Sequence, residues 1–486
     1  MNLPDLDLAA VLKGLEVKDF SAEEYVRTLL AQADRWRTLN VFIAFDEERA
    51  INLAQRCDAV RLSGEAGPLT GLPLAVKDNI DVAGLPTTGG ASALYDNRVA
   101  TTAPVLSGLL TQGAYVLGKT NLHELASGAT SRNETFGYVR TPYDPARCAG
   151  GSSGGTAAAL AARIAPAGLG TDTGASVRLP SSYCGTAALR PTVGQKMSDR
   201  RYSPSGVVPA SPTTDTIGPM ARTVTDVALL DAAIVGRPPV AAADLRQVRL
   251  GIPHDPFWRG LDSDVEALCL EAMENLGQCG ATFVETDLLA DVNNLNDKAT
   301  SLILWEVRRA LPEYLLASNV KMGWQELIEQ ISAADVRFMM ERADMVTERQ
   351  YVEARDLWRP KVVQAYERLF RDACVDGYLI PVTTGLPPLA CDEPHGTTRM
   401  NFVHKRLVEF SQLTRNLSAS AMAGLPALAF PAGLTRGGLP VGIEIGGPPG
   451  SDDRILAIGI AAEAAIGRIP APPFLFEDDL TRVTPG

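Results

Sequence analysis

Two glycine- and serine-rich runs constrain this chain more than any other feature of its sequence. The first run, GGSSGG, spans residues 150–155, and the second, GTDTGAS, spans residues 170–176. Such runs let backbone N–H groups approach a ligand closely and tolerate unusual backbone angles. The alanine-rich segment between them is too small and apolar for a surface helix. For GGSSGG alone, two turns around a buried helix would be the simpler interpretation, but the paired runs predict hydroxyl groups that converge on one point.

A lysine at the end of a short apolar strand adds a third part to this pattern. Residues 71–81 read GLPLAVKDNID, and the expected strand ends at Lys77. An unpaired ammonium is costly to remove from water, so Lys77 either reaches the surface beside Asp78 or has a function inside the protein. Burial lowers the pKa of a lysine and makes it a base near neutral pH. Such a lysine can deprotonate a serine through a second hydroxyl, because serine–lysine hydrolysis is an established variant of the Ser-His-Asp triad.

Other hydrolytic and cofactor chemistries lack their motifs here. None of the four histidines adjoins a glycine-rich nucleophile turn, and no G-x-S-x-G elbow is present, although distance along the chain leaves a Ser-His-Asp triad open. No H-E-x-x-H motif or dense His/Asp/Glu cluster indicates a metal site. GGSSGG also lacks the ending of a phosphate loop and the spacing of a dinucleotide turn. We therefore expect no metal and no cofactor, which leaves the hydroxyl groups and the lysine.

Charge and hydropathy narrow the class of protein. The net charge is −12, and the nine lysines form no basic run, which argues against a nucleic-acid surface. No apolar run approaches the roughly 20 residues that span a bilayer. The first 20 residues are acidic and do not resemble a signal peptide, so we expect a cytoplasmic protein. Seven cysteines without CxxC spacing indicate scattered reduced thiols, with Cys148 and Cys184 as small packing residues.

Strands and helices alternate along most of the 486 residues. This alternation predicts an α/β fold with a mixed or parallel sheet that helices cover on both faces. A loop is expected at 211–219. Strands are expected at 41–45, 71–77, 114–120, 165–171, 248–253, 281–287, 378–384, 427–431 and 441–446. Helices are expected at 21–36, 46–63, 103–113, 223–235, 264–279 and 404–423, after each glycine-rich run, and from about residue 452.

The segment from about 290 to 375 differs from the rest, because it is charged, poor in glycine and helical throughout. We expect this helical insert to form a pocket wall or a lid. Its aromatic residues favour packing between helices, and an apolar wall against a ligand is the alternative. They are Trp305, Tyr314, Trp324, Phe338, Tyr351, Trp358 and Tyr366.

GGSSGG followed by GTDTGASVRLPSSYCG, with Lys77 upstream in AVKDN, resembles the amidase signature family. The similarity runs from about residue 20 to the end and includes GLPALAFPAG and GLPVGIEIGG within 424–447. It implies one large α/β domain over 1–486, with a mixed sheet covered by helices on both faces. The signature core would span about 65–235, and the helical insert about 290–375.

The resemblance implies a role for each residue of the pattern. Lys77 would be the general base, Ser152 the proton relay next to a cis peptide bond, and Ser176 the acylated nucleophile. Ser153, Asp172 and Arg178 would fix the catalytic turn from outside. Backbone N–H groups would form the oxyanion hole and stabilise the transition state; they belong to Thr173, Gly174, Ala175 and Ser176.

One position departs from the family pattern. Two glycines usually precede the nucleophile, whereas this chain has Gly174-Ala175-Ser176. Alanine keeps the N–H donor, so the oxyanion hole survives the change. If the position requires a positive φ, alanine costs about 1 kcal/mol. Its methyl group would also trim the acyl side of the pocket.

The amino-acid sequence of residues 150–232 most resembles the branch of the family that contains indoleacetamide and mandelamide hydrolases. It implies hydrolysis of the C–N bond of small aryl or arylalkyl amides. Carbamate (urethane), anilide and ester hydrolysis with the same triad stay open. Two readings of other kinds also stay open, a glutaminase subunit of a tRNA-dependent amidotransferase and a non-catalytic anion-binding protein. The expected partner is a small-molecule amide or carbamate, with no nucleic acid or membrane, and a homodimer is left open.

Overall fold

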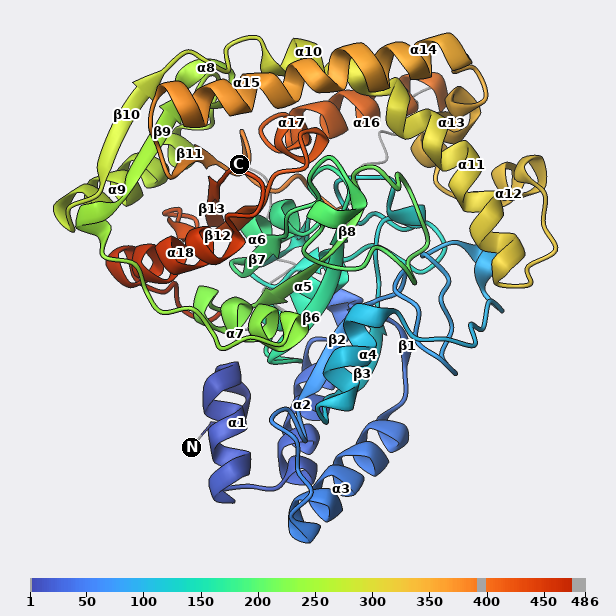
Figure 1. The fold of residues 1–486 in the computed structure, drawn as a ribbon. Helices are drawn as coiled ribbons and strands as arrows, with labels where there is room; N and C mark the ends of the chain where they lie inside the picture. The colour runs from blue at the N-terminus through green and yellow to red at the C-terminus, as the bar shows by residue number, and fades with distance from the viewer. Residues whose placement is uncertain (1, 391–398, 474–486) are drawn as a thin grey trace.

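The chain folds around one mixed sheet of eleven strands, as expected for the α/β class. The computed structural model describes residues 2–390 and 399–473. The strand order is β1-β3-β2-β6-β8-β7-β12-β13-β11-β9-β10, and helices cover both faces of the sheet (Figure 1). The strands are β1 (Phe42–Phe45), β2 (Pro73–Lys77), β3 (Tyr115–Thr120), β6 (Ala167–Asp172), β7 (Ala187–Arg190), β8 (Thr216–Ala221), β9 (Arg249–Pro253), β10 (Thr282–Thr286), β11 (Gly377–Pro381), β12 (Ala427–Leu434) and β13 (Pro440–Gly446). A separate pair consists of β4 (Arg140–Thr141) and β5 (Asp144–Cys148).

The helices fall close to the predicted ranges. The expected helix at 404–423 is in fact two, α16 and α17. Before and within the core lie α1 (Leu8–Val17), α2 (Ala22–Arg35), α3 (Glu47–Ser63), α4 (Pro104–Thr111), α5 (Gly154–Ala161), α6 (Arg178–Cys184), α7 (Val224–Val235), α8 (His254–Phe257) and α9 (Ser263–Gln278). After them come α10 (Val292–Ala299), α11 (Ser301–Ala317), α12 (Trp324–Gln330), α13 (Ala334–Ala343), α14 (Glu348–Glu353), α15 (Arg359–Asp372), α16 (Arg399–Thr414), α17 (Ser418–Met422) and α18 (Asp452–Ile466).

Strand β2 shows how the sheet positions a functional side chain. Leu74 and Val76 pack with residues of α4 and α7 on one face, and Ala75 packs with the alanines of α5 on the other. Because side chains alternate along a strand, Lys77 belongs to the same face as Ala75. That face is covered by α5, whose first two residues, Gly154 and Gly155, are the last two of GGSSGG. The lysine and the first glycine-rich run therefore meet.

Glycine allows this run to approach its neighbours closely. A Cβ atom on Gly151 would lie 2.9 Å from backbone atoms of residues 129–131, and one on Gly155 would lie 2.4 Å from the carbonyl oxygen of Asn121. Both distances are too short for any side chain. Helix α5 is buried along its whole length, as the small alanine side chains predict.

The expectation of a loop at 211–219 is wrong for its second half. Residues Thr216–Ala221 form β8, a fully buried strand that pairs antiparallel with β6 and β7. Its sequence, TIGPMA, contains Gly218 and Pro219, and proline is normally confined to sheet edges. Pro219 nevertheless lies opposite Leu169 inside the sheet. The expected β-α-β unit at 248–287 is confirmed, because β9 and β10 pair in parallel.

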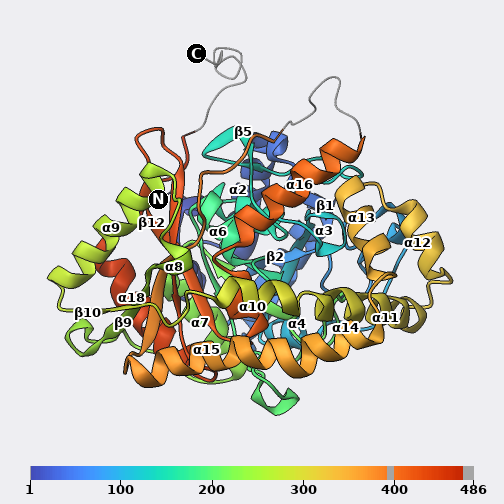
Figure 2. The same cartoon turned by 90° about the horizontal axis from the view of Figure 1, so that it is seen from above.

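The helices α10 to α15 form the segment that the sequence predicts as helical. Figure 2 shows α10, α14 and α15 along one side of the molecule, near α16. Helix α10 packs against α15 and α17, and α13 packs against α16. The insert thereby lies beside the two helices that follow the segment 391–398. Cys391, one of the seven cysteines, lies outside the described residues; Cys148 and Cys184 are buried.

Candidate active site

Lys77 is fully buried at the carboxyl end of β2. Its Nζ atom donates hydrogen bonds to Ser152 Oγ at 2.7 Å and to Thr171 Oγ1 at 2.8 Å. The Asn79 amide donates to the same Thr171 oxygen at 3.0 Å. Burial lowers the pKa of Lys77 to about 7, although Asp172 and Asp215 partly oppose the shift. A large fraction of the amine is therefore uncharged near neutral pH and able to accept a proton.

The backbone around Ser152 is held from several directions. The Gly151–Ser152 peptide bond is cis. The Ser152 carbonyl oxygen accepts hydrogen bonds from the His123 N–H at 3.2 Å and from the Ser131 hydroxyl at 3.3 Å. Ser131 Oγ in turn accepts the N–H of Gly154 at 3.1 Å. These contacts fix the hydroxyl of Ser152 beside the amine of Lys77.

Ser153 joins the two glycine-rich runs. Its N–H donates to the carbonyl oxygen of Ser176 at 3.1 Å, and its hydroxyl donates to the carbonyl oxygen of Thr171 at 3.2 Å. No hydrogen bond joins the hydroxyl groups of Ser152 and Ser176 within the described residues. The backbone bond from Ser153 keeps the two serines in adjoining segments.

The turn 173–176 between β6 and α6 carries Ser176. Across the residues that the structure describes, the backbone N–H groups of this turn have no protein acceptor. The next N–H, that of Val177, donates to Asp172 Oδ2 at 3.2 Å. Unpaired N–H groups beside a hydroxyl are the donors that an oxyanion hole requires. The four residues of this turn also line a cavity.

Ala175 fits this turn without the penalty considered above. Its φ is not positive, so alanine adopts the backbone conformation without strain. The Ala175 side chain is buried in an apolar cluster with Leu179 and Leu417 and borders the cavity. The methyl group therefore contributes packing as well as part of the cavity surface.

A buried ionic network lies behind the turn. Arg178 bonds both carboxylate oxygens of Asp172, at 3.1 and 3.2 Å, and also Glu444 at 3.0 Å and the carbonyl oxygen of Gly174 at 2.8 Å. Arg190 reaches Asp172 Oδ1 at 2.9 Å. Burial alone would raise the pKa of Asp172, but the two guanidinium groups outweigh it and lower the pKa to about 2. Charged Asp172 and Arg178 thus anchor the turn from the protein side.

A second carboxylate holds the start of the turn. The Thr173 hydroxyl donates to Asp215 Oδ1 at 2.6 Å, and Asp215 Oδ2 accepts the N–H groups of Ala210 and Ser211 at 2.8 Å each. Burial raises the pKa of Asp215 to about 6. Glu306 of α11 accepts the Ser211 hydroxyl at 2.6 Å. The helical insert is therefore connected to the turn through this loop.

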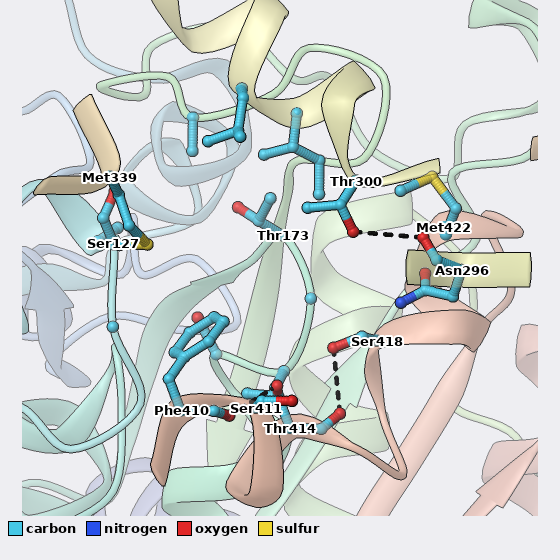
Figure 3. Close-up of a pocket in the computed structure, with 18 of the residues that line it drawn as sticks. Ser127, Thr173, Asn296, Thr300, Met339, Phe410, Ser411, Thr414, Ser418 and Met422 are labelled. Carbon is cyan, nitrogen blue, oxygen red and sulfur yellow. Dashed lines mark hydrogen bonds between the residues drawn. The ribbon is translucent and has the colours of Figure 1, made fainter. Parts of the chain in front are cut away.

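The cavity above Ser176 has a volume of about 370 Å³ (Figure 3). We name two parts of its lining. The floor consists of Gly151 and the turn 173–176, with Ser152 and Lys77 beneath. The wall is the lining contributed by α10, α11 and α13 of the insert. Residues 126–128, Ala210 and the segment from α16 to α17 supply the remaining lining. The size suits a small organic molecule.

The insert lines the cavity with aliphatic side chains. Ile303, Leu304, Val307, Met339 and Met340 form the apolar part of the wall. The aromatic residues of 300–370 do not line this cavity, so the alternative that gave them a ligand-facing role is wrong. Trp305, for example, stacks on Tyr351 with ring centroids 5.2 Å apart. Packing between helices is their role.

Comparison with known proteins places this site in a family. The Amidase family model matches residues 24–456. The chain belongs to the amidase family. It is 37% identical to an indoleacetamide hydrolase of Agrobacterium vitis over 470 residues, which cover 96% of this chain and 98% of that protein. It is also 37% identical to a mandelamide hydrolase of Pseudomonas putida over 490 residues, covering 97% and 93%.

The fold comparison agrees with this assignment. A crystal structure of an amidase superposes with a TM-score of 0.81 at 30% identity, covering 95% of this chain and all of that one. The protein is thus an amidohydrolase with the amidase fold. Among the residues that the structure describes, no helix is long and apolar enough to cross a membrane. No group of three or more His, Cys, Asp or Glu side chains in that part of the chain is arranged to hold a metal ion.

The amidase site contains residues that the sequence did not single out. Thr171 accepts the second hydrogen bond of Lys77, and Ser131 supports the cis peptide segment. Arg190 and Glu444 complete the ionic network from β7 and β13. Thr171 lies inside the GTDTGAS run, so the motif could have identified it as a site residue. The other three come from segments that only the tertiary structure brings together.

Proposed function

We propose that this amidase hydrolyses the C–N bond of small aryl or arylalkyl amides, with Ser176 as nucleophile, Ser152 as relay and Lys77 as general base. One observation carries the proposal: a buried amine with a pKa near 7 lies 2.7 Å from the Ser152 hydroxyl. The adjoining turn presents a serine and unpaired N–H groups to a cavity. These parts are the requirements of acyl transfer.

The proposed mechanism builds on the hydrogen bond between Lys77 and Ser152 and requires the Ser176 hydroxyl to turn toward Ser152. Uncharged Lys77 accepts the Ser152 proton while Ser152 accepts the proton of Ser176, whose oxygen attacks the amide carbonyl. The N–H groups of 173–176 stabilise the oxyanion, and each such donor contributes about 3 kcal/mol in the transition state. The C–N bond then breaks, and the amine leaves with the proton returned by the relay. Water hydrolyses the ester of Ser176 by the same proton path and releases the acid.

The cavity and the relatives support aryl and arylalkyl amides as substrates. Two similar proteins are named for indoleacetamide and mandelamide. The aliphatic wall of Ile303, Leu304 and Val307 gives an apolar ring a surface to pack on. Phe410, from α16, adds an aromatic edge to the lining. An amide with an apolar body and an uncharged leaving amine fits this lining.

The same attack applies to carbamates, anilides and esters, because each presents an acyl carbon to Ser176. A glutaminase subunit of a tRNA-dependent amidotransferase is the alternative that requires a protein partner. We further propose a cytoplasmic enzyme whose partner is a free small-molecule amide or carbamate, and a homodimer is the assembly to test.

Three alanine variants test the proposal. Ser176→Ala, Ser152→Ala and Lys77→Ala are assayed on phenylacetamide, a phenylacetate ester, an aryl carbamate and glutamine. Each variant is expected to lose at least about 10³-fold in kcat/KM on every accepted substrate. Lys196→Ala, at an exposed lysine, is the control and keeps full activity. Full activity in Ser176→Ala would refute the proposal, and hydrolysis confined to glutamine in the presence of a partner protein would favour the glutaminase.

A further inference from the structure

Helix α10 turns a polar stripe toward the cavity. Asn293, Asn296 and Asp297 of α10 line the cavity together with Thr300, which directly follows the helix, and their i, i+3, i+4, i+7 spacing places them on one helical face. The neighbouring helix α11 contributes Ile303, Leu304 and Val307 instead. The wall is therefore divided into a polar and an aliphatic part. A purely apolar substrate would leave the polar part without a partner.

Asn296 is the buried member of this stripe. Its side chain is only 8% exposed, and Oδ1 has no hydrogen-bond partner within the described residues. The one hydrogen bond that the structure gives this residue's carbonyl group comes from Thr300 Oγ1 to the backbone oxygen at 3.2 Å, which leaves the side-chain amide unused. Figure 3 shows Asn296 among the residues that line the cavity. A buried amide without partners is costly, so such a group calls for an explanation.

The neighbours of Asn296 do not supply a partner. Ser418, on α17, donates its hydroxyl to the carbonyl oxygen of Thr414 at 3.0 Å. Arg415 donates to the carbonyl oxygen of Arg259 at 2.7 Å. The outward-facing Asn294 of the same helix bonds Asp291 Oδ1 at 2.9 Å. Asn293 and Asn296 both face the cavity, and of these two Asn296 is the buried one, with an amide oxygen that no described residue bonds.

We propose that the Asn296 carboxamide is a specificity-determining residue that binds a hydroxyl or ring N–H group carried by the apolar part of the substrate. This inference rests on the proposed function, since it assigns the substrate to the same cavity. A carboxamide both donates and accepts hydrogen bonds, and a 180° rotation of the amide group exchanges its two polar atoms, so it matches either group. The scissile carbonyl occupies the turn 173–176, and Asn296 on α10 supplies a second, separate anchor. The preferred substrates are then aryl amides that carry one uncharged polar group on the ring.

Binding to a protein that cannot turn over tests this inference apart from catalysis. Phenylacetamide and its 2-, 3- and 4-hydroxy derivatives are titrated by calorimetry into Ser176→Ala protein, alone and combined with Asn296→Leu. Leucine keeps the branched shape of asparagine and removes both polar atoms. Asn294→Leu in the same background is the matched control, and unfolding curves verify that each variant is folded. In parallel, turnover of the same amides by the protein with Ser176 intact tests the proposed function.

The expected result is that at least one hydroxy isomer binds Ser176→Ala protein more tightly than phenylacetamide. Asn296→Leu is then expected to weaken that isomer about tenfold and phenylacetamide by less than twofold, because one buried hydrogen bond is lost. Asn294→Leu leaves both affinities unchanged. The inference is overturned if no isomer is preferred, if none of the amides binds, or if Asn296→Leu weakens all of them equally. Absence of turnover despite the expected binding would overturn the proposed function alone.

Discussion

The floor and the wall of the cavity are built on opposite principles. Beneath and behind the floor, charged and polar groups are fully buried and tied to one another, as in Asp172, Arg178 and Glu444. Facing the cavity, the wall instead presents a polar stripe and an aliphatic part. Its ion pair between Arg308 and Asp344 is partly exposed, and the buried pair of Asp335 with Arg406 lies behind it. Ion pairs behind the floor hold its turn in place, whereas the wall presents shape and, among the described residues, the buried and unpartnered amide oxygen of Asn296.

This difference suits the floor to catalysis and the wall to substrate recognition. A catalytic turn has to hold N–H groups and a hydroxyl in a fixed geometry, and buried charge pairs supply that rigidity at a cost in desolvation. A binding wall works through apolar contact and tolerates variation in its residues. We therefore expect changes in the floor to alter stability and kcat, and changes in the wall to alter KM and substrate preference.

Removing one partner of the buried network has the largest expected effect on stability. Arg178→Met removes a buried positive charge that pairs with both Asp172 and Glu444. It should therefore lower the free energy of unfolding by about 3–5 kcal/mol. Arg308→Met, which breaks a partly exposed ion pair with Asp344 in the insert, should cost less than about 1 kcal/mol. Urea unfolding of both variants measures the contrast. Equal losses would show that the floor is no more tightly coupled than the wall.

Replacing Lys77 is expected to stabilise the protein while it abolishes activity. The folded-state pKa is about 7 against an ordinary 10.5, so between these values the unfolded state binds more protons. Wild-type stability therefore rises with pH across this window, and burial of the amine costs most at pH 7 and below. Lys77→Met removes this cost and also loses the two hydrogen bonds of the amine. The net result at pH 7 should be a free energy of unfolding that is ~2 kcal/mol higher than in the wild type.

The pH dependence of unfolding checks this expectation. The gain from Lys77→Met should shrink as pH rises from 7 to 10, because the deprotonated amine is no longer costly to bury. Lys119→Met is the matched control, since this equally buried lysine pairs with Asp78 at 2.9 Å and its removal should destabilise. A Lys77→Met variant that is less stable than wild type at every pH would mean that the amine is not held uncharged.

Single changes in the wall and the floor should separate KM from kcat, with the smallest effects of the series. Leu304→Ala removes apolar contact and should raise KM for phenylacetamide about fivefold with kcat nearly unchanged. Thr173→Val removes the bond to Asp215 and should lower kcat about tenfold with KM nearly unchanged. Trp305→Leu, beside Leu304 but outside the cavity, should change neither. Steady-state kinetics measure kcat and KM for each variant. A higher KM in Trp305→Leu would show that the aromatic residues of the insert do contribute to substrate binding.

The amidase fold and the positions of the site residues could largely be predicted from local sequence. Lys77, Ser152 and Ser176 stand in motifs with specific spacing, and alternation along β2 explains why the first two meet. Strand β8 was missed because Gly218 and Pro219 mimic a turn, while its burial depends on pairing with β6 and β7.

The rest required tertiary structure. Arg190 and Glu444 join Asp172 and Arg178 only because β7 and β13 come close in the sheet. The polar stripe of α10 has the composition of a solvent-facing helix surface, so the sequence gives no sign that Asn296 is buried. The sequence favoured helix packing for the insert aromatics, and Trp305 does stack on Tyr351. It did not indicate which aliphatic residues of the insert line the cavity in their place.

We propose that uncharged Lys77 activates Ser176 through Ser152. The most direct measurement is the rate at which a fluorophosphonate modifies Ser176 between pH 5 and 9, with the site identified by peptide mass spectrometry. We expect the rate to rise with a single ionisation at pH about 7, the pKa of Lys77, and to fall at least about 10³-fold in Lys77→Ala. A rate that is independent of pH in this range, or that is unchanged in Lys77→Ala, would contradict it.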